Sequence, residues 1–154
     1  MNRLISALVL LILCSAPCLA QQSLVGTYKL VSIDRELDGK PKPQPAKPRH
    51  GYLVISAQTF VVFYTEGDRK YGTSEREKAA LWDTLTAVAG TYRLDGGKII
   101  VSVDTSWNEI YVGTQQTRDW QLQGKHLVLS SGARPYGRDT SKTVVQRQNW
   151  EKIE

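Results

Sequence analysis

Arg118 is the residue whose chemistry this sequence makes easiest to anticipate. It lies in the alternating run at residues 116–122, where the large apolar side chains of Trp120 and Leu122 mark the inward face of a strand. Arg118 has the same phase and should also face inward. An enclosed guanidinium is costly unless it is paired, and it offers a two-pronged donor to a carboxylate or phosphate. The spacing therefore predicts an anion-binding group inside the fold.

A structural role is the alternative for Arg118. Its guanidinium could stack on an aromatic ring and close one end of the fold, with Tyr28 and Trp150 as the candidate partners. The residues alone leave both roles open.

Two glutamines near the C-terminus are the next candidates. Trp150 marks the inward face of the last strand-like run, and Gln146 and Gln148 share its phase. With Arg118 and Tyr64, these amides are expected to hydrogen-bond a polar group of a ligand. The other interpretation places both glutamines at an open rim, or satisfies them through water.

An apolar wall is expected beside these polar groups. Residues 52–56 and 59–65 are two strand-like runs separated by Ala57 and Gln58, which predicts a hairpin. The side chains expected to share its inward face are Leu53, Ile55, Phe60, Val62 and Tyr64. The predicted ligand-binding residues are Arg118, Trp120, Tyr64, Gln146, Gln148, Leu53, Phe60 and Val101.

Residues for catalysis or metal binding are scarce. His50 and His126 have no spacing that suggests a metal site. Asp104 and Glu109 flank Trp107, but two carboxylates become an acid and a base only through a suitable geometry. No nucleophile elbow, phosphate loop or HExxH pattern is present. The sequence predicts no metal and no cofactor, and it assigns no catalytic residue.

The first twenty residues have the pattern of an export leader. Arg3 gives a short basic start, residues 4–13 are apolar, and residues 18–20 form a small-residue cleavage site. The apolar run of about ten residues is too short for the roughly 20 that span a membrane. We expect a cleavable signal peptide at residues 1–20 and a periplasmic or secreted protein.

Cleavage would remove every sulfur atom from the chain, because Met1, Cys14 and Cys18 all lie in this leader. Thiolate catalysis, cysteine-ligated metals and disulfides are then excluded. The alternative is a lipoprotein acylated at one of the cysteines, but Leu13 and Pro17 stand where a small residue is expected.

The predicted mature chain, residues 21–154, has the length of one domain. Without Arg3 it holds 19 Lys and Arg against 15 Asp and Glu, a formal charge of +4. The basic residues gather only in the proline-rich segment at residues 38–50, which proline keeps from forming a continuous strand. That segment offers neither stacking aromatics nor a groove-binding helix, so a solvated loop is expected and a nucleic-acid partner is not.

About eight strands are expected in all, and successive tight turns make neighbouring strands antiparallel. A meander of this length closes most economically into an up-and-down β-barrel, which removes exposed edges. In the first strand, we expect Tyr28, Leu30 and Ser32 on one face and Val31 and Ile33 on the other. The predicted strands are residues 24–34, 52–56, 59–65, 91–94, 99–105, 113–122, 126–130 and 143–150.

One α-helix is predicted, over residues 74–89. Ser74 and Glu77 form a capping-box pattern, and Gly90 is expected to end the helix. Trp82 should widen its apolar face and pack it against the barrel or across one end, rather than contact a ligand. The residues that recur at helical spacing are Leu81, Leu85 and Val88.

Several short motifs, taken in order, resemble the bacterial lipocalin-like domain family. They are LVGTYKLVS (24–32), GYLVI (51–55), GTY (90–92), VGTQ (112–115) with Arg118, LVL (127–129) and WE (150–151). The resemblance implies an antiparallel, calyx-type barrel. In more distant relatives it implies a pocket for small apolar molecules or, occasionally, cyclisation chemistry. It supplies no catalytic set.

Two residues depart from the pattern. Tyr28 stands where lipocalins favour tryptophan, which keeps an aromatic anchor and adds a hydroxyl. Val101 stands where similar domains often place a histidine, and the loss of that imidazole weakens an enzymatic interpretation.

Three functions follow as hypotheses. The first is an exported protein that binds a small hydrophobic or amphipathic molecule, with its acidic end toward Arg118. The second is a cavity-based cyclase or isomerase in which Tyr64, Arg118 or Asp104 steers protons. The third is an envelope protein with a filled barrel, which meets a partner through the proline-rich loop or residues 131–141. No transmembrane anchor is expected.

Overall fold

The computed structural model describes residues 24–42, 49–67, 69–136 and 139–154. The predicted signal peptide at residues 1–20 and most of the proline-rich loop lie outside these ranges. Among the described residues, no helix combines the length and the apolar character needed to cross a membrane.

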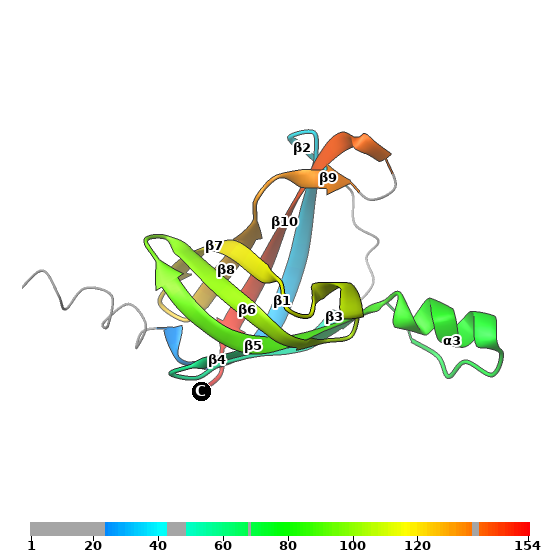
Figure 1. Cartoon of the computed structure of the whole chain (residues 1–154), viewed down its shortest axis with the longest axis horizontal. Helices are drawn as coiled ribbons and strands as arrows, with labels where there is room; N and C mark the ends of the chain where they lie inside the picture. The colour runs from blue at the N-terminus through cyan, green and yellow to red at the C-terminus, as the bar shows by residue number, and fades with distance from the viewer. Residues whose placement is uncertain (1–23, 43–48, 68, 137–138) are drawn as a thin grey trace, which may run out of the picture.

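Eight antiparallel strands form a closed barrel, which confirms the predicted fold class (Figure 1). The strands are β1 (Gly26–Leu37), β3 (Arg49–Ile55), β4 (Thr59–Glu66), β5 (Leu85–Asp95), β6 (Lys98–Ser106), β7 (Gln115–Gln123), β8 (His126–Ser131) and β10 (Asp139–Lys152). They follow one another around the barrel in chain order, and β1 pairs with β10 to close it. Closure gives the first and last strands partners on both sides.

Two short strands extend this sheet beyond the barrel. β2 (Lys40–Pro41) pairs with the end of β1, and β9 (Arg134–Tyr136) pairs with the beginning of β10. Together they form an arm at the top of Figure 1. Neither short strand is predicted from the sequence.

The core occupies the barrel interior and reaches the end where β1 begins. The predicted hairpin across Ala57 and Gln58 is confirmed, and it pairs Leu53 with Val62 and Ile55 with Phe60. The buried apolar cluster is Leu24, Tyr28, Leu30, Ile33, Leu53, Ile55, Phe60, Val62, Tyr64, Val88, Tyr92, Ile99, Val101, Val103, Leu127, Leu129 and Trp150.

A bulge in β1 overturns part of the predicted face assignment. The register of β1 against β10 shifts between Leu30 and Ser32, so Val31 becomes an extra residue. Val31 is 60% exposed, whereas Ile33 is 1% exposed and belongs to the core. The prediction that Ile33 shares the outer face of Val31 is therefore wrong, because an extra residue inverts the alternation beyond it.

The helix predicted over residues 74–89 is shorter than expected. α3 spans Glu75–Trp82, and the chain from Leu85 onward belongs to β5. Val88, expected on the apolar face of the helix, instead pairs with Val62 of β4. Pairing with β4 on one side and β6 on the other outweighs the helical spacing of a few apolar residues.

Gly90 does not end a helix but lies inside β5. A Cβ atom at this position would stand 1.9 Å from the carbonyl oxygen of Ser102, so the two backbones approach too closely for any side chain. The register of β5 against β6 also shifts between Ala89 and Gly90. Glycine is required here by the close approach of two strands.

The capping box of α3 is confirmed, but the predicted packing of this helix is wrong. The amide of Glu77 donates to the hydroxyl oxygen of Ser74 (3.3 Å), and the amide of Ser74 donates to the Glu77 carboxylate (2.9 Å). No residue of α3 is buried, and Trp82 is 54% exposed. Figure 1 shows the helix projecting away from the barrel. Its apolar residues are consecutive at positions 79–82, so they form no stripe that could face the barrel.

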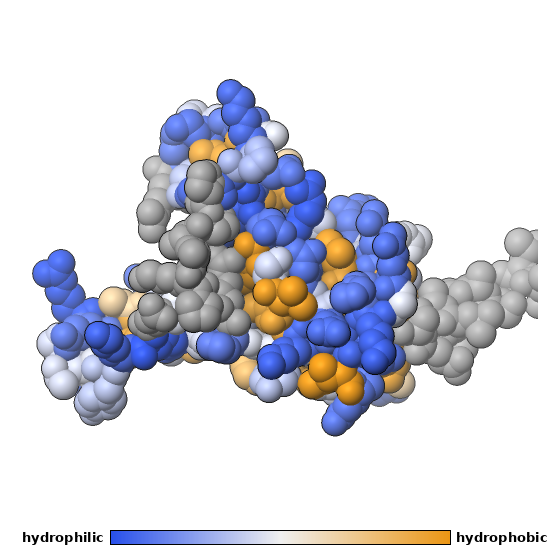
Figure 2. All heavy atoms as spheres, turned by 180° about the vertical axis from the view of Figure 1, so that it is seen from behind, coloured by the Kyte–Doolittle hydropathy of each residue, from blue (hydrophilic) through white to orange (hydrophobic). Residues whose placement is uncertain are grey.

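The outside of the barrel carries exposed apolar side chains among polar ones (Figure 2). Tyr52 of β3 and Phe63 of β4 pair across the two strands, and their ring centroids lie 5.7 Å apart. Val31 and Val54 are exposed on neighbouring strands.

Candidate ligand-binding pocket

An open pocket of about 710 Å³ lies at one end of the barrel. Its lining includes Arg35, from late in β1, and Tyr64, from late in β4, whereas Tyr28 lies early in β1. The pocket is therefore at the opposite end of the barrel from Tyr28. Its volume is within the range of about 300–1,000 Å³ that small-molecule sites occupy.

The connection between β6 and β7 builds an aromatic wall. A single 3₁₀ turn, η1 (Glu109–Tyr111), places the ring of Tyr111 5.2 Å from that of Trp107, centroid to centroid. The hydroxyl of Thr114 donates to the carbonyl oxygen of Tyr111 (2.7 Å) and holds the turn. Leu85, Val88 and Leu129 complete the apolar part of the lining.

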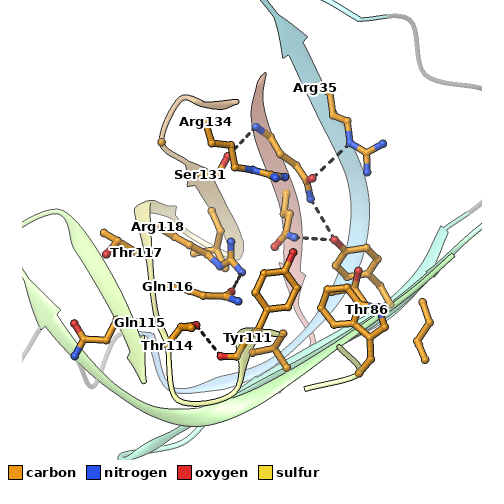
Figure 3. Close-up of a pocket in the computed structure, with 18 of the residues that line it drawn as sticks. Arg35, Thr86, Tyr111, Thr114, Gln115, Gln116, Thr117, Arg118, Ser131 and Arg134 are labelled. Atoms are coloured by element: carbon orange, nitrogen blue, oxygen red, sulfur yellow. Dashed lines mark hydrogen bonds between the residues drawn. The ribbon is translucent and has the colours of Figure 1, made fainter. Parts of the chain in front are cut away.

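Arg118 points into this pocket from β7 (Figure 3). One terminal nitrogen donates to the amide oxygen of Gln116 at 2.7 Å. The Nε atom of Arg118 is buried and has no hydrogen-bond partner among the residues that the structure describes. None of the ion pairs among the described residues involves Arg118. The side chain therefore holds a buried donor and a charge that no described carboxylate neutralises.

Burial lowers the pKa of Arg118 from its ordinary value. The positive charge of Arg134 acts in the same direction, while Tyr64 and Tyr111 oppose it. A guanidinium keeps its proton in proteins despite such shifts, so the pocket retains the positive charge.

A chain of hydrogen bonds crosses the pocket from β1 to β4. The Nε atom of Arg35 donates to the amide oxygen of Gln146 (3.4 Å), and the amide nitrogen of Gln146 donates to the Tyr64 hydroxyl (3.2 Å). The amide nitrogen of Gln148 also donates to that hydroxyl (3.4 Å). The Tyr64 oxygen accepts twice, so its hydrogen is available to a partner in the pocket. The amide oxygen of Gln148 is buried and has no hydrogen-bond partner in the described ranges.

The lining is positively charged. Among the described residues, it contains the guanidinium groups of Arg35, Arg118 and Arg134 and the carboxylate of Asp83. In the part of the chain that the structure describes, no three His, Cys, Asp or Glu side chains gather where they could hold a metal ion.

The eight predicted ligand-binding residues fall into two groups. Arg118, Tyr64, Gln146 and Gln148 come together in the lining of the pocket. The other four do not line it: Leu53, Phe60 and Val101 are buried in the core, and Trp120 packs against the core. The apolar positions expected to enclose a ligand instead interdigitate with one another and fill that part of the barrel.

The stacking alternative for Arg118 is wrong. Its hydrogen-bond partner is Gln116, and it lines the pocket at the far end of the barrel from Tyr28. A different cation lies over the Tyr28 ring, that of Lys152, with its Nζ atom 5.9 Å from the centroid. Asp104, named with Arg118 and Tyr64 for proton transfer, is exposed and does not line the pocket.

Several lining residues were not predicted. For one of them the strand phase could have given the prediction, and for the others the local sequence gives no such signal. Gln116 has the phase of Arg118 and could have been included on that ground. Arg35 has the outward phase when counted from Tyr28, and only the bulge at Val31 turns it toward the pocket. Tyr111 and Arg134 belong to short elements whose position depends on the closed barrel.

Comparison with known proteins supports this architecture. The model of one family, described as the lipocalin-like domain, matches residues 25–153. No curated protein matches the chain.

Proposed function

The chain belongs to the lipocalin-like domain family, whose barrel is consistent with small-molecule binding, and we propose that it binds a small amphipathic molecule in the open pocket. The acidic group of this molecule pairs with Arg118. We further propose that binding occurs outside the cytoplasm, because residues 1–20 have the pattern of a signal peptide.

The observation that carries the proposal is the buried guanidinium of Arg118. A guanidinium with a buried Nε atom that lacks a partner among the described residues is unfavourable, and an anionic ligand that reached it would remove that cost. After a small rotation of the side chain, the Nε and a terminal nitrogen could together hold both oxygens of a carboxylate. The Tyr64 hydroxyl supplies another donor across the pocket.

The apolar part of the ligand is assigned to the aromatic wall. Trp107 and Tyr111 present adjacent rings, and Leu85, Val88 and Leu129 extend the apolar lining. Contact with these side chains would remove apolar ligand surface from water, at about 25 cal/mol per Å².

Displacement of a fluorescent fatty acid by decanoate tests the proposal. Arg118→Met keeps a long, flexible side chain but removes the charge, so the affinity for decanoate should fall about tenfold or more, as expected for a lost charge-assisted hydrogen bond. The matched control is Arg93→Met, because Arg93 is exposed on β5, forms an ion pair with Asp95 and does not line the pocket. Native mass spectrometry of protein purified from its own host gives an independent search for a ligand.

The control protein should bind decanoate as the wild type does. Failure of the wild type to bind, or equal affinity of the Arg118→Met variant, would refute the proposal.

A further inference from the structure

We infer that the pocket selects a ligand whose head group carries two negative charges, held between Arg118 and Arg134. This inference rests on the proposed function and narrows its ligand class. A phosphate monoester and a geminal dicarboxylate share the required chemistry.

Arg134 enters the pocket lining from the arm rather than from the barrel. It lies in β9, where it pairs with Val144 of β10, and only two residues separate it from Ser131. Ser131 is itself the register partner of Arg118 on β7. Figure 3 shows the side chains of Arg118 and Arg134 both directed into the pocket. The fold therefore brings two guanidinium groups from different strands to one site.

Neither guanidinium is neutralised within the described part of the chain. Among the described residues, no ion pair involves Arg118 or Arg134. The two groups influence each other, since the charge of Arg134 helps to lower the pKa of Arg118. Like charges placed together at a partly enclosed site repel, and an anion between them turns that repulsion into attraction.

The charge of the two guanidinium groups matches a dianion. Arg118 and Arg134 together carry two positive charges, which a head group of charge −2 would neutralise. Arg35 already donates to Gln146, which leaves Arg118 and Arg134 as the principal contacts.

The neutral donors suit a head group with several oxygens. The Tyr64 hydroxyl accepts from two amides and has its own hydrogen to donate. Each of the three terminal oxygens of a phosphate could then accept from a different donor group, Arg118, Arg134 or Tyr64, whereas the two oxygens of a carboxylate would have to share the three donor groups.

Ligands that share a ten-carbon chain but differ in head group test the inference. Decyl phosphate carries two charges at neutral pH, decyl sulfate has a similar tetrahedral shape with one charge, and decanoate carries one charge. Decyl phosphate should bind about fivefold more tightly than decyl sulfate, as expected for one added ion pair near the surface. This advantage should shrink as the pH falls through about 6, where the phosphate loses its second charge, while binding of decyl sulfate stays level.

Arg134→Met provides the second arm of the test. This variant should lose the advantage of decyl phosphate over decyl sulfate, and its affinity for decanoate should stay nearly unchanged. Arg93→Met is the control and should keep that advantage. Decylmalonate separates the two sources of double charge. If it matches decyl phosphate, charge alone is selected, and if it binds less tightly, the tetrahedral shape contributes as well.

Equal affinities for decyl phosphate and decyl sulfate would overturn the inference, as would an Arg134→Met variant that weakens all ligands alike. In that case, decanoate binding that depends on Arg118 would still support the proposed function. If no ligand binds the wild type, the proposed function itself fails.

Discussion

The hydroxyl of Tyr28 donates a 2.8 Å hydrogen bond to the carbonyl oxygen of Leu24. Both residues are completely buried, at the end of the barrel away from the pocket. The tyrosine thus anchors the start of β1 as an aromatic residue and also satisfies a backbone group that water does not reach. This contact lies at the end of the barrel opposite the pocket.

Replacement of Tyr28 by phenylalanine should lower the free energy of unfolding by about 1–3 kcal/mol, because the Leu24 carbonyl is left buried without a donor. Urea denaturation measures this change. Tyr52→Phe is the matched control, since Tyr52 is exposed on the outside of β3. An equal loss of stability in both variants would argue against the buried hydrogen bond.

The same hydroxyl should make stability depend on pH under alkaline conditions. Burial raises the pKa of Tyr28 above its ordinary value of 10.0. Above about pH 10 the unfolded chain therefore loses this proton while the folded protein keeps it, which lowers the free energy of unfolding by up to about 1.4 kcal/mol per pH unit. The stability difference between the wild type and Tyr28→Phe should shrink between pH 9 and pH 11, roughly the range set by that ionisation. A constant difference would contradict the assignment.

The bulge in β1 predicts opposite outcomes for two neighbouring apolar residues. Ile33→Ala should destabilise the protein by about 2–5 kcal/mol, because Ile33 is in the core. Val31→Ala should change stability by no more than about 0.5 kcal/mol, because Val31 faces solvent. Thermal denaturation of the two variants distinguishes this register from uninterrupted alternation, which would place both side chains on one face.

The capping box should control the helix without affecting the barrel. Hydrogen bonds from the backbone and side chains of Ser74 and Thr73 lower the pKa of Glu77 to about 2. Glu77 therefore supports the helix above its ordinary pKa of 4.5, and this support is lost as the pH falls through about 2. The Glu77 carboxyl should titrate near pH 2 by NMR, and Ser74→Ala should reduce the helical chemical shifts of α3.

The global unfolding midpoint of Ser74→Ala should match that of the wild type, because no residue of α3 is buried. Glu75→Gln is the control for a first-turn carboxylate outside the capping box. A large fall in the midpoint would show that α3 packs on the barrel in solution.

Ligand binding should be detected by Trp107, the tryptophan that lines the pocket. Decanoate should change the fluorescence of the wild type, because its chain replaces water beside the indole ring. Trp107→Phe should lose most of this change, whereas Trp82→Phe should keep it, since Trp82 lies on the exposed helix. A response that survives in Trp107→Phe would place the ligand elsewhere.

The inward phase of four pocket residues could be predicted because strand alternation is a local property. Arg118, Gln146, Gln148 and Tyr64 follow the phase of their large apolar neighbours, and the structure places all four in the pocket lining. The same reasoning failed beyond Val31, because nothing in the local pattern marks the extra residue that shifts the register. Ile33 was assigned to the wrong face for that reason, and Arg35 lies beyond the predicted strand.

The predicted bounds of the helix were also correct only where they depended on local contacts. Ser74 and Glu77 identify the helix start through hydrogen bonds within four residues, and this start is correct. The end is not, because residues 85–89 pair with β4 and β6, which are distant contacts that helical spacing does not reveal.

The sequence by itself determined the family, the antiparallel barrel and the inward direction of Arg118, because these depend on alternation, turn residues and short motifs along the chain. Only the tertiary structure decided which part of the barrel is filled and which part is open. Leu53, Phe60 and Val101 have the same inward phase as Arg118, but whether an inward side chain meets a neighbour or a cavity depends on strand register and closure. The approach of Arg134 to Arg118 likewise arises only when β9 pairs with β10 beyond the barrel.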